Sequence, residues 1–274
     1  MPMSTSTPLS ETLPDLQGSD DHRRIPINKV GITDLKLPIR FKAADGQYMP
    51  AEAMVSMLVS LPPERKGTHM SRFLEVFAEF SETLCPDSIG KLCETLCQRL
   101  DAEQAWVDLE FTWFMKKKAP ATEMEGWVDF TARLSGAHDR SADPSQRTAM
   151  GVSAPATSLC PCSREISAYG AHNQRCEITA DVCLTDSMHL EELIRILEES
   201  ASCEIYSVLK RPDEKVVTEV AYENPKFVED IVRDVACRLN DESRVNWYRV
   251  TSKNFESIHN HNAFAEIIKD DTRP

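Results

Sequence analysis

The segment at residues 86–100 reads PDSIGKLCETLCQRL, and its apolar residues fall on one stripe of a helix. The stripe comprises positions 89, 92, 93, 96, 97 and 100, which is the spacing of an amphipathic α-helix. A proline at the first position suits a helix start. The segment PKFVEDIVRDVACRL at 225–239 repeats this proline and this stripe position for position, 139 residues later (from 86 to 225). The unbroken register indicates two copies of one structural unit.

The segments that flank the two stripes predict the same order of elements in both halves. Apolar and polar residues alternate over 107–115, which predicts a strand after the first stripe, and 244–250 occupies the matching place. Further strands are expected at 28–44, 48–61, 128–134, 147–159, 173–185 and 263–268, and further helices at 73–84 and 190–197. Each half therefore reads β-β-α-α-β-β, which predicts an α+β fold with antiparallel strands. Because a four-stranded sheet has two open edges, we expect assembly into a closed multi-subunit barrel.

The polar segment 138–147 contains a proline and lies between the two halves. We therefore expect an N-terminal module at 26–140 and a C-terminal module at 146–274. Residues 1–25 are rich in Ser, Thr, Pro and Asp and lack apolar periodicity, so we expect a disordered tail there.

The composition restricts the partners of the chain. Its 31 basic and 44 acidic residues give a net charge of −13, which disfavours general binding to nucleic acid or to an anionic membrane. No apolar run approaches the roughly 18 residues that span a bilayer, and the N-terminus does not resemble a signal peptide. We therefore expect a cytoplasmic protein whose nine cysteines are reduced thiols.

The side chains best suited to chemistry are concentrated in the second half. They are Cys160, Cys162, His172, Glu214, Glu229, Glu256, His259 and His261. Thiolate, imidazole and carboxylate are the ligands of a catalytic zinc ion or a similar divalent ion. On spacing alone, the simpler interpretation is a pair of cysteines at a strand end with two polar loop histidines. The segment 211–215 is equally compatible with a solvated turn, and the lysines at 116–118 are interpreted as a solvated turn after a strand.

Four motifs carry a resemblance that covers nearly the whole chain beyond the tail. They are NKVGI at 28–32, KGTHMSRF at 66–73, SLCPCS at 158–163 and YGAHNQR at 169–175. In this order they closely resemble type IB GTP cyclohydrolase I, a hydrolase that acts on cyclic amidines. The resemblance implies conversion of GTP and water to 7,8-dihydroneopterin triphosphate and formate, which feeds folate-type pterins and queuosine precursors. It also implies the tunnelling fold with two modules per chain, a homotetramer, and a divalent metal such as zinc or manganese.

The same resemblance suggests roles for individual residues. Cys160 matches the metal-binding catalytic cysteine of the family, whereas Cys162 has no implied role. The positions that surround the metal correspond to His172, Glu214, Glu256 and His259. Glu229 resembles the glutamate that anchors the purine, and a carboxylate can accept hydrogen bonds from guanine N1–H and the 2-amino group. The equivalent position in the first half is Gly90, so we expect that module to be structural.

Cations that contact the triphosphate are expected on the first module. His69 and Arg72, with Lys66 nearby, are the candidates, and packing at an interface is the alternative interpretation. Two rival functions remain open for the whole chain. One is another tunnelling-fold enzyme, such as a pterin synthase or a nicotinamide-dependent nitrile reductase with a nucleophilic cysteine. The other is a non-catalytic metal-storing or scaffold protein.

Overall fold

The computed structural model describes residues 15–142 and 146–269. Of the expected tail, residues 1–14 lie outside the described residues. Residues 17–21 instead form backbone hydrogen bonds with the segment 64–67, as in the donation from the Asp21 N–H to the Glu64 carbonyl at 2.8 Å. The expected module boundary at residue 26 therefore lies inside the described chain. No described helix is both long and apolar enough to cross a membrane.

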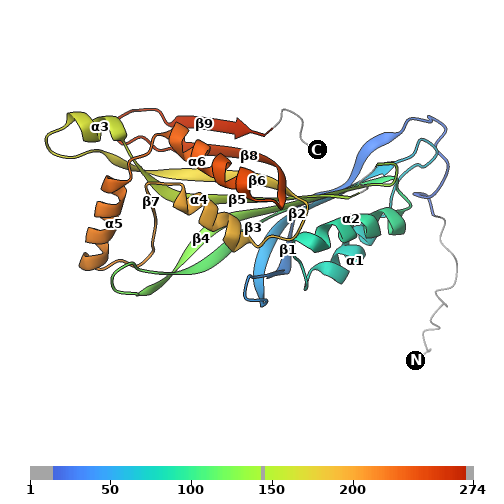
Figure 1. Cartoon of the computed structure of the whole chain (residues 1–274). Coiled ribbons are helices and arrows are strands. Elements are labelled where there is room, and N and C mark those ends of the chain that lie inside the picture. Colours follow the sequence, from blue (N-terminus) through green and yellow to red (C-terminus); the bar gives the residue numbers. More distant parts are fainter. Residues whose placement is uncertain (1–14, 143–145, 270–274) are drawn as a thin grey trace, which may run out of the picture.

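The strands form one nine-stranded sheet in which every pair is antiparallel. Its order is β1-β2-β3-β4-β5-β6-β8-β9, and the short β7 pairs with β5. The strands are β1 (Ile27–Lys42), β2 (Tyr48–Leu61), β3 (Gln104–Lys118), β4 (Glu125–Asp139), β5 (Gln146–Leu159), β6 (Asn173–Leu184), β7 (Cys203–Glu204), β8 (Val245–Asn254) and β9 (Ala263–Ile268). The expectation of an antiparallel α+β fold is confirmed, and the pairing of β4 with β5 joins the strands of both halves (Figure 1).

The helices pack mainly along the sheet (Figure 1). They are α1 (Met70–Phe80), α2 (Pro86–Leu100), α3 (Pro161–Ile166), α4 (Leu190–Glu199), α5 (Arg211–Glu223) and α6 (Val228–Asp241). The first half has the order β-β-α-α-β-β, whereas the second half contains α3, β7 and α5 in addition. The alternative of a solvated turn at 211–215 is therefore wrong, because this segment begins α5.

The stripes of α2 and α6 form the contact between helix and sheet. Every predicted stripe position in both helices is buried, and burying each large apolar side chain contributes about 2 kcal/mol. Gly136 of β4 shows how closely α2 approaches, because a Cβ at this position would lie 2.1 Å from Cγ2 of Ile89. Any larger residue at 136 would push the helix away from the sheet. The helix α1 ends at Phe80, four residues before the expected end.

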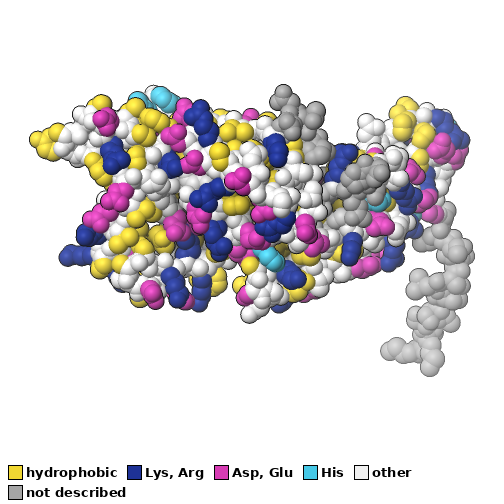
Figure 2. All heavy atoms as spheres, in the orientation of Figure 1, with side chains coloured by type: hydrophobic (Ala, Val, Ile, Leu, Met, Phe, Trp, Pro, Cys, Tyr) yellow, Lys and Arg dark blue, Asp and Glu magenta, His cyan; other side chains and the backbone are white. Residues whose placement is uncertain are grey.

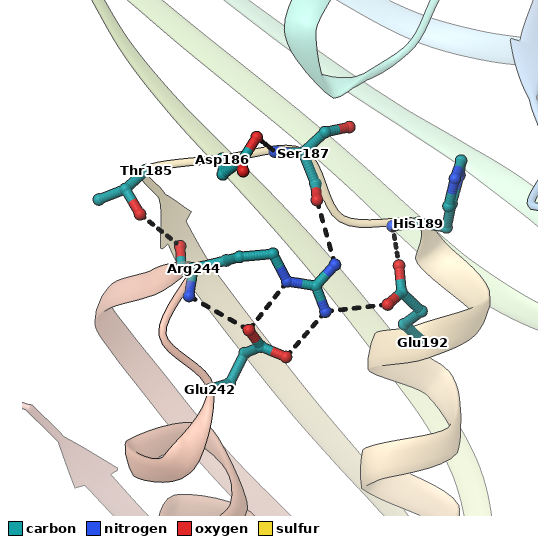
Figure 3. A network of polar contacts seen from close by, with 7 residues as sticks. All are labelled: Thr185, Asp186, Ser187, His189, Glu192, Glu242 and Arg244. Atoms are coloured by element: carbon teal, nitrogen blue, oxygen red, sulfur yellow. Dashed lines mark hydrogen bonds and ion pairs between the residues drawn. The ribbon is translucent and has the colours of Figure 1, made fainter.

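Polar contacts fix the ends of α4 and α6 relative to each other. The Arg244 guanidinium lies between two carboxylates, with Nη2 2.9 Å from Glu192 Oε1 and 2.7 Å from Glu242 Oε2 (Figure 3). Its Nη1 donates to the Ser187 carbonyl at 3.1 Å. The hydrogen bond from Arg244 lowers the pKa of Glu242 to about 2. This junction joins the start of α4, the end of α6 and the start of β8.

The helix α5 is attached to the turn between β3 and β4 through one buried carboxylate. Asp213 accepts hydrogen bonds from the backbone N–H groups of Ala121 and Thr122, both at 2.8 Å, and from the Thr122 hydroxyl at 2.6 Å. It also accepts from the N–H of Lys210 at 2.9 Å, which caps the helix. Burial would raise the pKa of Asp213, but these hydrogen bonds outweigh it and lower the pKa. The first turn of α5 is thereby held in place.

Lys117 contradicts the interpretation of residues 116–118 as a solvated turn. Its side chain is only 8% exposed, and its Nζ lies 2.6 Å from Glu198 Oε1 at the end of α4. The same ammonium pairs with Glu204 and lies 4.7 Å from the centroid of the Tyr206 ring. The run of lysines predicted exposure to solvent, which is wrong for Lys117 because helices from the second half cover the end of β3. Burial, together with the nearby Glu204, raises the pKa of Glu198 to about 7, although the charge of Lys117 opposes this shift.

We predict that Glu198→Gln removes a pH dependence of stability. Folded Glu198 holds its proton up to about pH 7, whereas an ordinary glutamate releases it near 4.5. The folded state therefore binds more protons between these values, and the free energy of unfolding falls as the pH rises, by at most about 3 kcal/mol from this group. Urea unfolding at about pH 5 and about pH 8 should show a smaller loss in the variant.

The matched control for this prediction is Glu219→Gln, which removes an exposed carboxylate of α5. It should keep the slope of the unmodified chain. Equal pH slopes for the unmodified chain and Glu198→Gln would contradict the prediction.

Candidate active site

Cys160 lies directly after β5, where the chain turns into the short helix α3. Pro161 occupies the first helical position, and the backbone N–H of Ser163 donates to Sγ of Cys160 at 3.5 Å. The thiol is half-buried, whereas Cys162 is exposed. The two cysteines therefore differ in environment. The family resemblance also distinguishes them, since it implies a role for Cys160 and none for Cys162.

The register of β5 and β6 brings His172 beside Cys160. Leu159 pairs with Asn173 at the end of this ladder, and the backbone N–H of Cys160 donates to the His172 carbonyl at 3.1 Å. The backbone N–H of His172 in turn donates to the Ser163 hydroxyl at 3.2 Å. Cys160 and His172 are therefore neighbours through backbone pairing, across 12 residues of sequence.

Gln174 connects the imidazole to the segment that follows β8. Its Oε1 lies 2.8 Å from Nδ1 of His172, and its Nε2 donates to Glu256 Oε1 at 3.5 Å. The Ser257 hydroxyl lies 3.3 Å from the same Nδ1. Because the amide oxygen of Gln174 can only accept, this geometry favours a proton on Nδ1 and a lone pair on Nε2. Sequence reasoning missed Gln174, although residues i and i+2 of a strand share one face.

A second, buried network ties this site to the start of α6. The Asn254 amide donates to the Ser158 hydroxyl at 2.8 Å, and this hydroxyl donates to the Lys226 carbonyl at 2.9 Å. The backbone N–H of Lys226 donates to the Leu159 carbonyl at 3.0 Å. Glu229 lies in the first turn of α6 and is exposed. The network therefore holds the helix that carries Glu229 against the strand that ends at Cys160.

Two of the expected metal-site residues do not join the cluster of Cys160, His172 and Glu256. Glu214 is exposed in the first turn of α5. His259 is exposed and stacks on His261, with ring centroids 5.1 Å apart. Among residues 15–142 and 146–269, no three His, Cys, Asp or Glu side chains lie close enough together to hold a metal ion. The described side chains of one chain therefore do not form a complete set of metal ligands.

The expected triphosphate contacts lie in the other half of the fold. His69 precedes α1, and its Nε2 is 3.1 Å from Oδ2 of Asp15. His69 and Arg72 line a small pocket of about 170 Å³ together with Arg65, while Lys66 is exposed nearby. The helix α1 and the helix α3 beside Cys160 lie toward opposite ends of the fold (Figure 1).

Comparison with known proteins adds to this geometry. Residues 13–265 match the family model described as type I GTP cyclohydrolase folE2. The GTP cyclohydrolase FolE2 of Magnetococcus marinus is 47% identical over 255 residues, which are 93% of this chain and 95% of the relative. The GTP cyclohydrolase FolE2 of Azoarcus sp. is 44% identical over 97% of this chain and 98% of its own length.

The solved structures most informative about the fold are uricases. A uricase from Bacillus fastidious superposes with a TM-score of 0.56 at 7% identity and covers 89% of this chain and 92% of its own. The uricase from Arthrobacter globiformis gives 0.50 at 7% identity, covering 90% and 95%. At this identity the likeness concerns the fold alone. The family model and its relatives, by contrast, extend over the β5–β6 end that carries Cys160 and His172, so the chain belongs to the type I GTP cyclohydrolase FolE2 family.

Proposed function

We propose that the chain converts GTP and water to 7,8-dihydroneopterin triphosphate and formate, the entry to pterin and folate biosynthesis. Membership of the type I GTP cyclohydrolase FolE2 family supports the reaction class. One observation carries the location of the site: the backbone of Cys160 pairs with that of His172, whose imidazole is hydrogen-bonded by the buried Gln174. A histidine whose second ring nitrogen is held by a hydrogen bond is a common feature of metal-binding sites.

The donor types of the expected metal-site residues suit a divalent ion such as zinc or manganese, although their side chains are not gathered closely enough among the described residues to hold one. Because Nδ1 of His172 donates to Gln174, Nε2 keeps a lone pair that can bind a metal ion. A hydrogen bond from the other ring nitrogen is usual in metal-binding histidines. Cys160 and Glu256 add a thiolate and a carboxylate. The residues that would hold the ion are Cys160, His172, Glu256, Glu214 and His259. When bound, such an ion lowers the pKa of water toward neutrality and thereby supplies hydroxide for attack on C8 of the purine.

Glu229 is proposed as the purine anchor. Its carboxylate is exposed in the first turn of α6, where it has no described partner that competes for guanine. It accepts two hydrogen bonds from N1–H and the 2-amino group of guanine. The network from Lys226 to Ser158 keeps this carboxylate at the same end of the sheet as Cys160. Glu256 and His259 are proposed to carry protons during ring opening, formate loss and ring closure.

The proposed assembly is a homotetramer of chains that each contain two tunnelling-fold modules. The sheet has two outer strands, β1 and β9, and an open edge is stabilised when another chain pairs with it. Because α1, which begins directly after His69 and contains Arg72, and α3, which begins directly after Cys160, lie toward opposite ends of the fold (Figure 1), His69 and Arg72 are proposed to contact the triphosphate at the site of a neighbouring subunit. Packing between subunits is the alternative role for this pair.

Cys160→Ala is predicted to lower formate release from GTP by about 10³-fold or more, because several kcal/mol of transition-state stabilisation depend on this thiolate. The measurement is formate release and pterin fluorescence after oxidation, with circular dichroism to confirm the fold. Cys162→Ala, which removes the exposed neighbour, should keep near-normal turnover.

Near-normal turnover of Cys160→Ala would exclude the proposed site. The same assay separates the rival functions. Chelation should stop pterin formation, and zinc or manganese should restore it, whereas a nicotinamide-dependent reductase would be spared. A metal-storing or scaffold protein would bind the ion but form no pterin from GTP.

Glu229→Gln is predicted to raise the KM for GTP by about 10–100-fold, because it weakens a charge-assisted hydrogen bond to guanine. The sharper readout is discrimination between GTP and ITP, which lacks the 2-amino group. The unmodified chain should prefer GTP, and the variant should lose most of this preference. Glu223→Gln, an exposed carboxylate at the end of α5, is the control; an unchanged preference in Glu229→Gln would refute the anchor.

Gln174→Ala is predicted to release the His172 ring from its single tautomer, because the variant lacks the oxygen that accepts from Nδ1. Nitrogen NMR of labelled histidine in the metal-free protein should report the Nδ1–H form for the unmodified chain and a mixture for the variant. Affinity for zinc should fall by about 10-fold or more. Ser257→Ala, which removes the longer contact, should have a smaller effect. An Nε2–H form in the unmodified chain would disprove this role.

A further inference from the structure

A pocket of about 550 Å³ is lined by residues other than Cys160, His172 and Glu256. It is enclosed by the end of β3, the end of α4, β7 and one side of α5. Its volume is within the range of small-molecule sites. None of the residues assigned above to metal, purine or triphosphate lines it, so the proposed reaction leaves this pocket without a role.

The walls of the pocket are apolar. The helix α5 contributes Val216, Val217 and Val220, and Met115 and Pro120 line the pocket from β3 and the turn that follows it. Figure 2 shows hydrophobic side chains at the end of the molecule where α5 meets the β3–β4 hairpin, with basic side chains at the border. Such walls suit a flat ring, which buries apolar area on both faces.

The base of the pocket is polar and has more acceptors than donors. Two carboxylates, Glu198 and Glu204, share the single ammonium of Lys117. The Tyr206 hydroxyl donates to Glu204 Oε1 at 2.7 Å. Lys117 and Glu198 are 8% and 9% exposed, whereas Glu204 is 37% exposed and lines the pocket. A ligand that offers N–H groups would therefore find carboxylate oxygen at the base.

The border of the pocket carries basic side chains that are available to a ligand. Lys118 and Arg195 line it and are exposed, and neither forms an ion pair within the described part of the chain. The adjacent Glu199 is already paired with Arg238 at 2.5 Å. In a chain of net charge −13, these two cations would attract an anionic group locally.

We propose that this pocket binds a small molecule in which a flat, N–H-bearing heterocycle carries an anionic group. The N–H groups donate to Glu204, the ring packs against the valines of α5, and the anion lies near Lys118 and Arg195. Guanine nucleotides and reduced pterins with acidic side chains share this chemistry. The proposal does not depend on the reaction at Cys160.

The pocket shares the helix α5 with one of the residues proposed to hold the metal ion. Its wall α5 also carries Glu214 in the first turn, on the helix that Asp213 attaches to the β3–β4 turn. A ligand that fills the space beneath α5 stabilises one position of this helix. Occupancy of the pocket and the position of Glu214 are thereby coupled through one rigid element.

The test measures binding of GMP and of 7,8-dihydrofolate to the full chain by calorimetry. The Glu229→Ala variant is used throughout, so that the proposed purine anchor does not contribute. We expect one binding event that Glu204→Gln weakens by about 10-fold or more and that Val220→Trp abolishes by filling the pocket. Two exposed positions of α5 that do not line the pocket provide matched controls, Glu219→Gln and Thr218→Trp, which should bind normally.

Binding of GMP alone would identify a nucleotide site, and binding of dihydrofolate alone would identify a pterin site; both outcomes support the proposal. Circular dichroism excludes unfolding of each variant, and the two pocket variants act by different means, loss of an acceptor and loss of space. The proposal is overturned if neither probe binds at about millimolar concentration, or if both pocket variants bind as well as their controls.

Discussion

The antiparallel pairing of β4 with β5 is the contact on which the rest of the structure depends. It satisfies the backbone groups of two strands that would otherwise be edges, and it makes one sheet from both halves of the chain. The helix α2 then packs across β4 and β5, and α4 packs on β5. Because β5 is fixed in this sheet, its far end presents Cys160 next to the start of β6. The positions of Cys160 and His172 therefore depend on the backbone hydrogen bonds between β5 and β6.

The fold was predictable where burial alone decides it. The stripes of α2 and α6 and the alternation in β3 predicted helices and strands correctly, because each element buries one face against the sheet. Lys117 was not predictable, since a lysine at a strand end is normally solvated and only the packing of α4 and β7 encloses it. The helix α5 was missed because no repeat of it exists in the first half.

A set of site residues could be predicted from the sequence, but the structure brings only some of them together. Cys160, His172 and Glu256 are linked through hydrogen bonds, whereas Glu214 and His259 face solvent on other elements. Exposed side chains at loop and helix ends are not held by core packing, so neither spacing nor burial fixes where they point. Gln174 was overlooked because an amide side chain is neither an acid or base catalyst nor one of the expected metal ligands. It orients His172 from a buried position on a strand.

The attachment of α5 by Asp213 has a consequence for how this family diverges. The carboxylate contacts backbone N–H groups of Ala121 and Thr122, which every residue except proline provides. Substitutions in the β3–β4 turn are therefore tolerated except at Thr122, whose hydroxyl also donates to Asp213 at 2.6 Å, while insertions or deletions shift the N–H groups away from the carboxylate. Among relatives, the length of this turn should change only together with the start of α5, even where the amino-acid sequences of both segments differ.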